Sequence, residues 1–146
     1  MSKIIPLISS GTPGPLGVVH LPRLWLKASL EARGILADGY PGCGKGYDQM
    51  VLDGLGVSRE KALAFIHDKR PTYPQFEAWV KSQPGVKLDK GSVEKLNASI
   101  RGYNHADATR KEILAASGIT DDGSILDAVN LNNLDDWFGF HQAHLK

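Results

Sequence analysis

Apolar residues recur at steps of three and four along most of the chain, which is the period of an amphipathic α-helix. The first such segment, residues 21–33, is apolar over most of its circumference and carries one polar stripe of Arg23, Lys27 and Glu31. A proline in its first turn and a glycine directly after it mark its ends. Because the polar stripe is so narrow, we expect this helix to lie largely buried at the centre of the domain.

The same period predicts further helices, separated by short connections that contain glycine, proline and capping residues. They cover residues 47–56, 58–69, 72–83, 92–103 and 107–118, a single turn within 124–129, and a last helix capped by Asn133. No segment alternates apolar and polar residues for long enough to predict a strand. The sequence therefore predicts an all-α fold, a single compact domain over residues 1–146 with about six or seven short helices.

Residues 1–19 break the helical pattern with three prolines and three glycines. Each proline fixes one torsion and removes a backbone donor, so we expect an irregular arm. Its apolar residues, such as Ile4, Ile5, Val18 and Val19, indicate that the arm packs on the helical body. The arm has no signal-peptide pattern, and no run approaches the about 18 apolar residues of a membrane span. We therefore expect a cytoplasmic protein with no membrane partner.

Composition narrows the classes of function. Of the 146 residues, 42% are apolar and 23% are charged, as in ordinary soluble proteins. The net charge of +1, from 17 basic and 16 acidic side chains, gives no electrostatic support for a nucleic-acid partner. The single cysteine, Cys43, excludes an internal disulfide and a multi-cysteine metal cluster. We predict no cofactor.

Residues 39–46, GYPGCGKG, come within one residue of a phosphate-binding loop. Lys45 follows Gly44 as the pattern requires, but Gly46 stands where a Ser or Thr hydroxyl would bind magnesium. The helical pattern also lacks the parallel sheet on which that motif depends. The sequence therefore argues against a nucleoside triphosphatase and favours a glycine-rich turn between helices.

Two other interpretations of this loop stay open. Its glycine amides and Lys45, beside the helix that starts near Asp48, could hold a carboxylate or a phosphate. Cys43 lies between two glycines and near Lys45, which are conditions that can lower the pKa of a thiol. Most lone cysteines are nevertheless inert.

The histidines give a further alternative. His141 and His144 lie one helical turn apart and could share a metal ion if Asp135 or His105 supplied another ligand. The end of a helix is also a favourable place for histidine without any metal. The second interpretation is favoured, and we predict no metal site.

Two segments, HLPRLWLKASLEARG and GYDQMVLDGLGVS, resemble a family of small bacterial helical domains of unknown function. The shared features are an LPR-x(3)-K start, here Leu21 to Lys27, and an Asp48–Gln49 pair that heads a helix ending in a Gly-Val turn. The resemblance covers residues 20–80 and does not extend to the C-terminal half. It implies a bacterial origin and draws attention to Arg23, Lys27 and Asp48, but it implies no reaction.

Arg23 and Lys27 allow two interpretations. They form part of a solvated face on which Glu31 partners Lys27, or they belong to a pocket in which Arg23 binds an anion with both guanidinium nitrogens. The arm and the glycine loop meet opposite ends of this helix, about 20 Å apart at 1.5 Å per residue. One site can use both only if the arm folds back along the helix.

The expected function is a small-molecule site, binding or catalytic, formed by the arm, the first helix and the 39–48 loop. Its ligand is unidentified and carries a carboxylate or phosphate. The candidate ligand-binding residues are Arg23, Lys27, Cys43, Lys45 and Asp48. The alternative is a protein-interaction or homodimerisation module without catalysis, which would use aromatic residues such as Trp137, Phe138 and Phe140.

Overall fold

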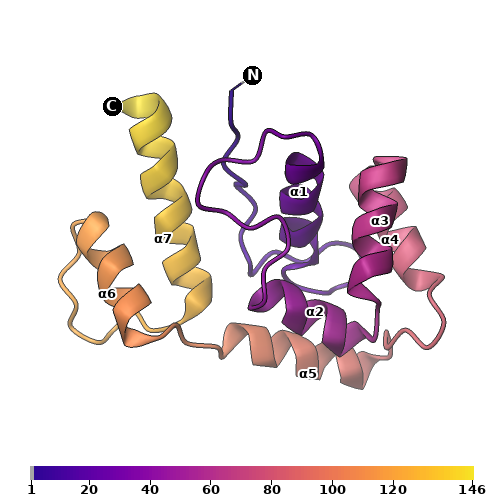
Figure 1. The fold of residues 1–146 in the computed structure, drawn as a ribbon. Coiled ribbons are helices and arrows are strands. Elements are labelled where there is room, and N and C mark those ends of the chain that lie inside the picture. The colour runs from indigo at the N-terminus through magenta and orange to yellow at the C-terminus, as the bar shows by residue number, and fades with distance from the viewer. Residues whose placement is uncertain (1) are drawn as a thin grey trace.

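A computed structural model describes residues 2–146, and Figure 1 shows how their helices are arranged. In chain order the helices are α1 (Leu21–Ala32), α2 (Tyr47–Leu55), α3 (Arg59–Lys69), α4 (Tyr73–Lys81), α5 (Lys90–Arg101), α6 (Asp107–Ala116) and α7 (Ala128–Phe140), followed by a π-helical turn, His141–Leu145. α1 and α2 lie in the middle, α3 and α4 on one side, and α6 and α7 on the other. α5 runs beneath α2 and also meets α7, so it connects the two sides.

The predicted fold class is confirmed. The described residues form seven α-helices in a single compact domain, and the extended segments among them make only three isolated β-bridges, with no sheet. The helix starts follow local chemistry. Thr72 and Gln75 form a reciprocal capping box at the start of α4, and the Ser58 hydroxyl accepts from the third amide of α3.

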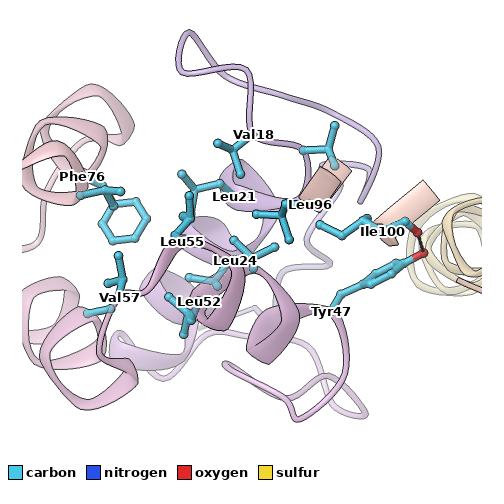
Figure 2. Packing of buried hydrophobic residues seen from close by; sticks show 14 of the residues in the cluster. Val18, Leu21, Leu24, Tyr47, Leu52, Leu55, Val57, Phe76, Leu96 and Ile100 are labelled. Atoms are coloured by element: carbon cyan, nitrogen blue, oxygen red, sulfur yellow. Dashed lines mark hydrogen bonds between the residues drawn. The ribbon is translucent and has the colours of Figure 1, made fainter. Parts of the chain in front are cut away.

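The core surrounds α1, as its narrow polar stripe predicted. Leu21 and Leu24 are fully buried, and Figure 2 shows them between Phe76 of α4 and Ile100 of α5. Across the core, the Tyr47 hydroxyl donates to the carbonyl of Ile100. Helices α2 and α5 approach closely because α2 has a glycine at position 54, where a Cβ would lie 2.6 Å from a methyl group of Leu96.

The N-terminal arm folds back along α1. The amide of Ile4 donates to the carbonyl of Ile35 at 2.7 Å, and the amide of Ala37 donates to the carbonyl of Ile4 at 2.9 Å. The arm therefore starts beside the C-terminal end of α1 and reaches its N-terminal end through Val18 and Val19, which are fully buried. The arm thus takes the path that a site shared with the glycine loop requires, but none of residues 2–19 lines the pocket beside that loop.

The predicted start of the last helix is wrong. α7 begins at Ala128, and its N-cap is Asp127 rather than Asn133, because an Asp127 carboxylate oxygen accepts from the amide of Asn130 at 2.9 Å. The separate turn predicted within 124–129 is therefore not a helix of its own. α5 also starts two residues earlier than predicted, at Lys90, since Asp89 caps it in the same way.

Candidate functional site

Four of the five candidate residues, Arg23, Lys27, Lys45 and Asp48, line one pocket of about 290 Å³. The pocket lies between α1, the glycine loop, the start of α2, the segment before α6 and residues 128–135 of α7. Further polar or aromatic residues that line it are His20, Tyr40, Tyr47, Tyr103, His105, Asn132 and Asp135. Cys43 does not line the pocket.

Asp48 is the centre of a buried cluster with His20 and Lys27. Its Oδ1 lies 2.6 Å from Nε2 of His20, and its Oδ2 accepts from Nζ of Lys27 and from the amide of Gly44, each at 2.6 Å. The three side chains are at most 7% exposed. One carboxylate thus joins α1, the glycine loop and α2.

The sequence positions these groups through helical geometry. His20 directly precedes α1, and Arg23 and Lys27 follow it at steps of three and four, so the three side chains lie on one face of α1. His20 has a left-handed backbone with φ of 69°, a conformation in which histidine is enriched among non-glycine residues. Asp48 lies in the first turn of α2, where the helix dipole favours a negative charge.

The charges in this cluster follow from burial. Burial lowers the pKa of His20, and the hydrogen bond to Asp48 and its charge offset that effect only in part. Burial alone would raise the pKa of Asp48, but the hydrogen bond from His20 and the charge of Lys27 outweigh it and lower the pKa below its usual value. A neutral His20 therefore donates from Nε2 to an ionised Asp48. Its Nδ1 is then an acceptor, and it is buried without a hydrogen-bond partner in residues 2–146.

We expect the stability of the protein to fall in acid in two steps. The unfolded chain protonates His20 near pH 6.5 and the folded protein resists it, so the free energy of unfolding decreases as the pH falls below 6.5. Because the pKa of Asp48 is depressed, its contribution is present above pH 3.8 and is lost as the pH falls below that value. Urea unfolding at a series of pH values between pH 8 and pH 2 gives the free energy of unfolding and so measures both steps.

His20→Gln is the matched variant for this titration, since the glutamine amide can still donate to Asp48 but does not titrate. It should lose the step below pH 6.5 and keep the one below pH 3.8. If the wild-type protein instead gained stability between pH 7 and pH 5, His20 would be an imidazolium in the folded state, and the cluster would have a different charge.

Arg23 faces Asp136 of α7 rather than Asp48. The two guanidinium NH groups lie 2.6 and 3.1 Å from the two Asp136 oxygens, and the Tyr40 hydroxyl donates to the same carboxylate at 2.9 Å. The guanidinium also donates to the carbonyls of Pro6 and Ile8 in the arm, at 2.9 and 2.8 Å. The bidentate geometry that the sequence suggested for a ligand is thus satisfied within the protein.

The solvated-face interpretation of the polar stripe is wrong. Arg23 is 5% exposed and Lys27 is 6% exposed. Glu31 does not partner Lys27, since its carboxylate accepts from the amide of Gly42 at 3.0 Å, while Lys27 pairs with Asp48. The three side chains of the stripe therefore connect α1 to its neighbours. Glu31 binds the glycine loop, Lys27 binds α2, and Arg23 binds α7.

Of the two interpretations of Cys43, the structure favours the inert one over a reactive thiol. Its thiol is half-buried, and burial together with the charge of Asp48 raises its pKa, against the smaller opposite effect of Arg59. Arg59 instead anchors the glycine loop by donating to the carbonyls of Cys43 and Gly44. Cys43 is therefore a packing residue under the loop, in contact with the core.

The start of α2 opens into the pocket without a side-chain cap. The first bond within the helix runs from the amide of Met50 to the carbonyl of Gly46, so the amides of Gly46 to Gln49 have no partner inside the helix. Lys45 directly precedes them, is exposed, and forms no ion pair with any of residues 2–146. Free amides and a free cation at a helix start suit an anion.

The wall contributed by α7 is polar as well. Nε2 of His105 lies 2.8 Å from the Asn132 carboxamide oxygen, which orients both side chains. Asp135 is exposed and accepts no hydrogen bond from any other described residue. Burial, and then the charge of the neighbouring Asp136, raises its pKa. Asp135 is thus a carboxylate without a protein partner on the same pocket as Lys45.

The described residues offer neither a metal cluster nor a membrane span. Residues 2–146 bring no three His, Cys, Asp or Glu side chains together in a way that could hold a metal ion, and His141 and His144 are exposed. Within the same range, no helix combines the length and the apolar character needed to cross a bilayer.

Comparison of the chain with protein-family profiles gives no match, and comparison with curated protein sequences gives none either. The resemblance to a family of small bacterial domains stays a prediction, carried by Leu21 to Lys27 and by the Asp48–Gln49 pair. Two of those positions, Lys27 and Asp48, form the buried ion pair described above.

Proposed function

We propose that this is a bacterial cytoplasmic protein that binds a small molecule through a carboxylate or phosphate, in the pocket between α1, the glycine loop and α7. The observation that carries the proposal is the uncapped start of α2, which opens into that pocket directly beside the unpaired Lys45. A helix start with free amides favours an anion, and a lysine next to it adds a full positive charge.

The candidate residues divide into two roles under this proposal. Lys45 and the amides of Gly46 to Asp48 contact the anionic group. Arg23, Lys27 and Asp48 hold the walls in place through buried ion pairs, so they position the site rather than neutralise the ligand. Because each of those charges already has a partner, they add little net attraction for an anion.

Anion binding can be measured by NMR at constant ionic strength, with inorganic phosphate and acetate as the probes. We expect saturable shifts of the amides of Gly46, Tyr47 and Asp48. Lys45→Gln should weaken the affinity by about threefold to tenfold, the effect of one charge-assisted contact. Lys61→Gln, which removes an exposed lysine in α3 outside the pocket, should leave the affinity unchanged.

Magnesium ATP serves as the specificity control, and we expect no saturable binding of it. Gly46 offers no hydroxyl to a metal, and the pocket volume lies at the low end for small-molecule sites. If neither phosphate nor acetate shifted the amides at the start of α2, even at high millimolar concentration, the proposal would be overturned.

A second candidate function is a protein-interaction or homodimerisation surface on α7. Trp137 is 60% exposed and lines a shallow hollow together with the apolar Ala116, Leu134 and Phe138 and the polar Ser117, His141 and Gln142. An exposed tryptophan among apolar side chains with a polar rim is the composition of an interface hot spot. Sedimentation equilibrium distinguishes the candidates, because a dimer dissociated by Trp137→Ser would favour this surface.

A further inference from the structure

His20 is the surplus titratable group in the buried polar cluster along α1. Lys27 already balances the charge of Asp48, and Arg23 balances the charge of Asp136. The cluster is therefore neutral as long as the imidazole of His20 is neutral. A proton on His20 would leave one positive charge in excess at a residue that is only 2% exposed, and an uncompensated buried charge is costly.

That proton would also find no acceptor. Nε2 of His20 donates to Asp48, so a second proton binds Nδ1, which is buried without a hydrogen-bond partner in residues 2–146. The ring of Tyr47 lies 5.2 Å from the imidazole, centre to centre, and its hydroxyl is turned to the carbonyl of Ile100. An N–H that is buried without an acceptor destabilises the closed cluster.

The surroundings of His20 do not offset this cost. The titratable groups that line the pocket around it are Arg23 and Lys27 of α1, Tyr40 and Lys45 of the glycine loop, Tyr47 and Asp48 of α2, Tyr103 and His105 before α6, and Asp135 of α7. Of the two carboxylates, Asp48 is already bonded to Nε2, and Asp135 is exposed, so water screens its charge. Burial is the main cause that lowers the pKa of His20, and the charges of Lys27 and Arg23 add to it.

We propose that His20 is an acid-sensitive switch: a proton on its imidazole breaks the contact with Asp48 and opens the junction of the arm, α1, the glycine loop and α2, while the rest of the domain stays folded. The imidazole has a way out of the cluster, because His20 lines the pocket of about 290 Å³. It also lies where the arm turns into α1, with a left-handed backbone that its contacts must hold in place. Acid would therefore change the wall of the pocket, whatever molecule the pocket binds.

Amide hydrogen exchange measures the opening of this junction. The first hydrogen bond of α1 runs from the amide of Leu24 to the carbonyl of His20 at 2.9 Å, and that of α2 from Met50 to Gly46 at 3.0 Å. Each opening takes up one proton below pH 6.5, so the opening equilibrium constants of Leu24 and Met50 should rise about tenfold for each unit of pH, once the pH dependence of intrinsic exchange is removed. Because the opening is local, low concentrations of urea should not change these constants.

The first bonds of α3 and α4 are the matched reference. They run from the amide of Ala62 to the carbonyl of Ser58 at 3.0 Å and from Phe76 to Thr72 at 2.9 Å, both outside the junction. Their opening constants should stay the same between pH 7.5 and pH 5. This comparison separates a local opening from a loss of stability of the whole domain.

Two variants assign the effect to one histidine. His20→Gln can still donate to Asp48 but does not titrate, so it should abolish the rise at Leu24 and Met50. His105→Gln removes another histidine that lines the same pocket, and the rise should remain as in the wild type. Circular dichroism confirms that both variants are folded. If His20→Gln did not fold, the urea dependence of the wild-type protein would still decide between local and global opening.

Three outcomes would overturn the switch. Opening constants of Leu24 and Met50 that stay unchanged down to pH 5 would mean that the closed cluster accommodates the proton. A rise that Ala62 and Phe76 share, and that urea makes larger, would mean that acid acts only by unfolding the whole domain. A rise that survives in His20→Gln would assign the effect to another group.

Discussion

Replacing Asp136 with alanine is expected to lower the free energy of unfolding by about 3–5 kcal/mol, because the Arg23 guanidinium would remain buried without its carboxylate. The two side chains are 6% and 4% exposed, so water cannot replace the lost partner. The Tyr40 hydroxyl would lose its acceptor in the same step. Urea unfolding with an unchanged m-value measures the loss.

The neighbouring carboxylate provides the control. Asp135→Ala removes the same group one residue earlier, but Asp135 is exposed and has no partner among the described residues, so we expect a change within about 0.5 kcal/mol. Arg23→Met combined with Asp136→Leu removes both charges, and should be closer to the wild type than Asp136→Ala alone. If Asp136→Ala lowered the free energy of unfolding by less than about 1 kcal/mol, the ion pair between Arg23 and Asp136 would not be what holds α7 to α1.

This pair also shows what the helical pattern cannot reveal. Arg23 and Asp136 are 113 residues apart, and the pattern predicts local helices rather than which distant side chains meet. With the start of the last helix placed at Asn133, Asp135 and Asp136 looked alike, as acids in a first turn. With the helix starting at Ala128, both aspartates lie in its second half, and their side chains point in different directions. Asp136 faces Arg23, and Asp135 faces the pocket.

The polar stripe of α1 was the most informative part of the sequence. It predicted the buried central helix and identified Arg23 and Lys27 as candidate site residues. The family resemblance added Asp48. His20 was missed, although it lies three residues before Arg23 and extends the same face. Its position ahead of the first turn, outside the apolar run, left it without a helical assignment, and only the fold of the loop places Asp48 against it.

A substitution at Leu24 tests whether α1 is buried at the centre of the core, as its narrow polar stripe predicts. Leu24→Ala is expected to destabilise the protein by about 2–5 kcal/mol, as large core residues cut to alanine do. Leu24 is fully buried and lies in the core cluster with Leu52 and Leu55 of α2, so the cavity left behind cannot be filled by solvent. Chemical denaturation, followed by tryptophan fluorescence, measures the change in free energy of unfolding.

Leu7→Ala is the matched substitution at an exposed position. Leu7 lies in the arm and is 48% exposed, so the same loss of three methyl and methine carbons should cost less than about 1 kcal/mol. The difference between the two variants measures burial itself, since side chain and replacement are identical. Should Leu24→Ala cost no more than Leu7→Ala, α1 would not be central to the core, and the buried ion pairs along it would lose the apolar surroundings on which their strength depends.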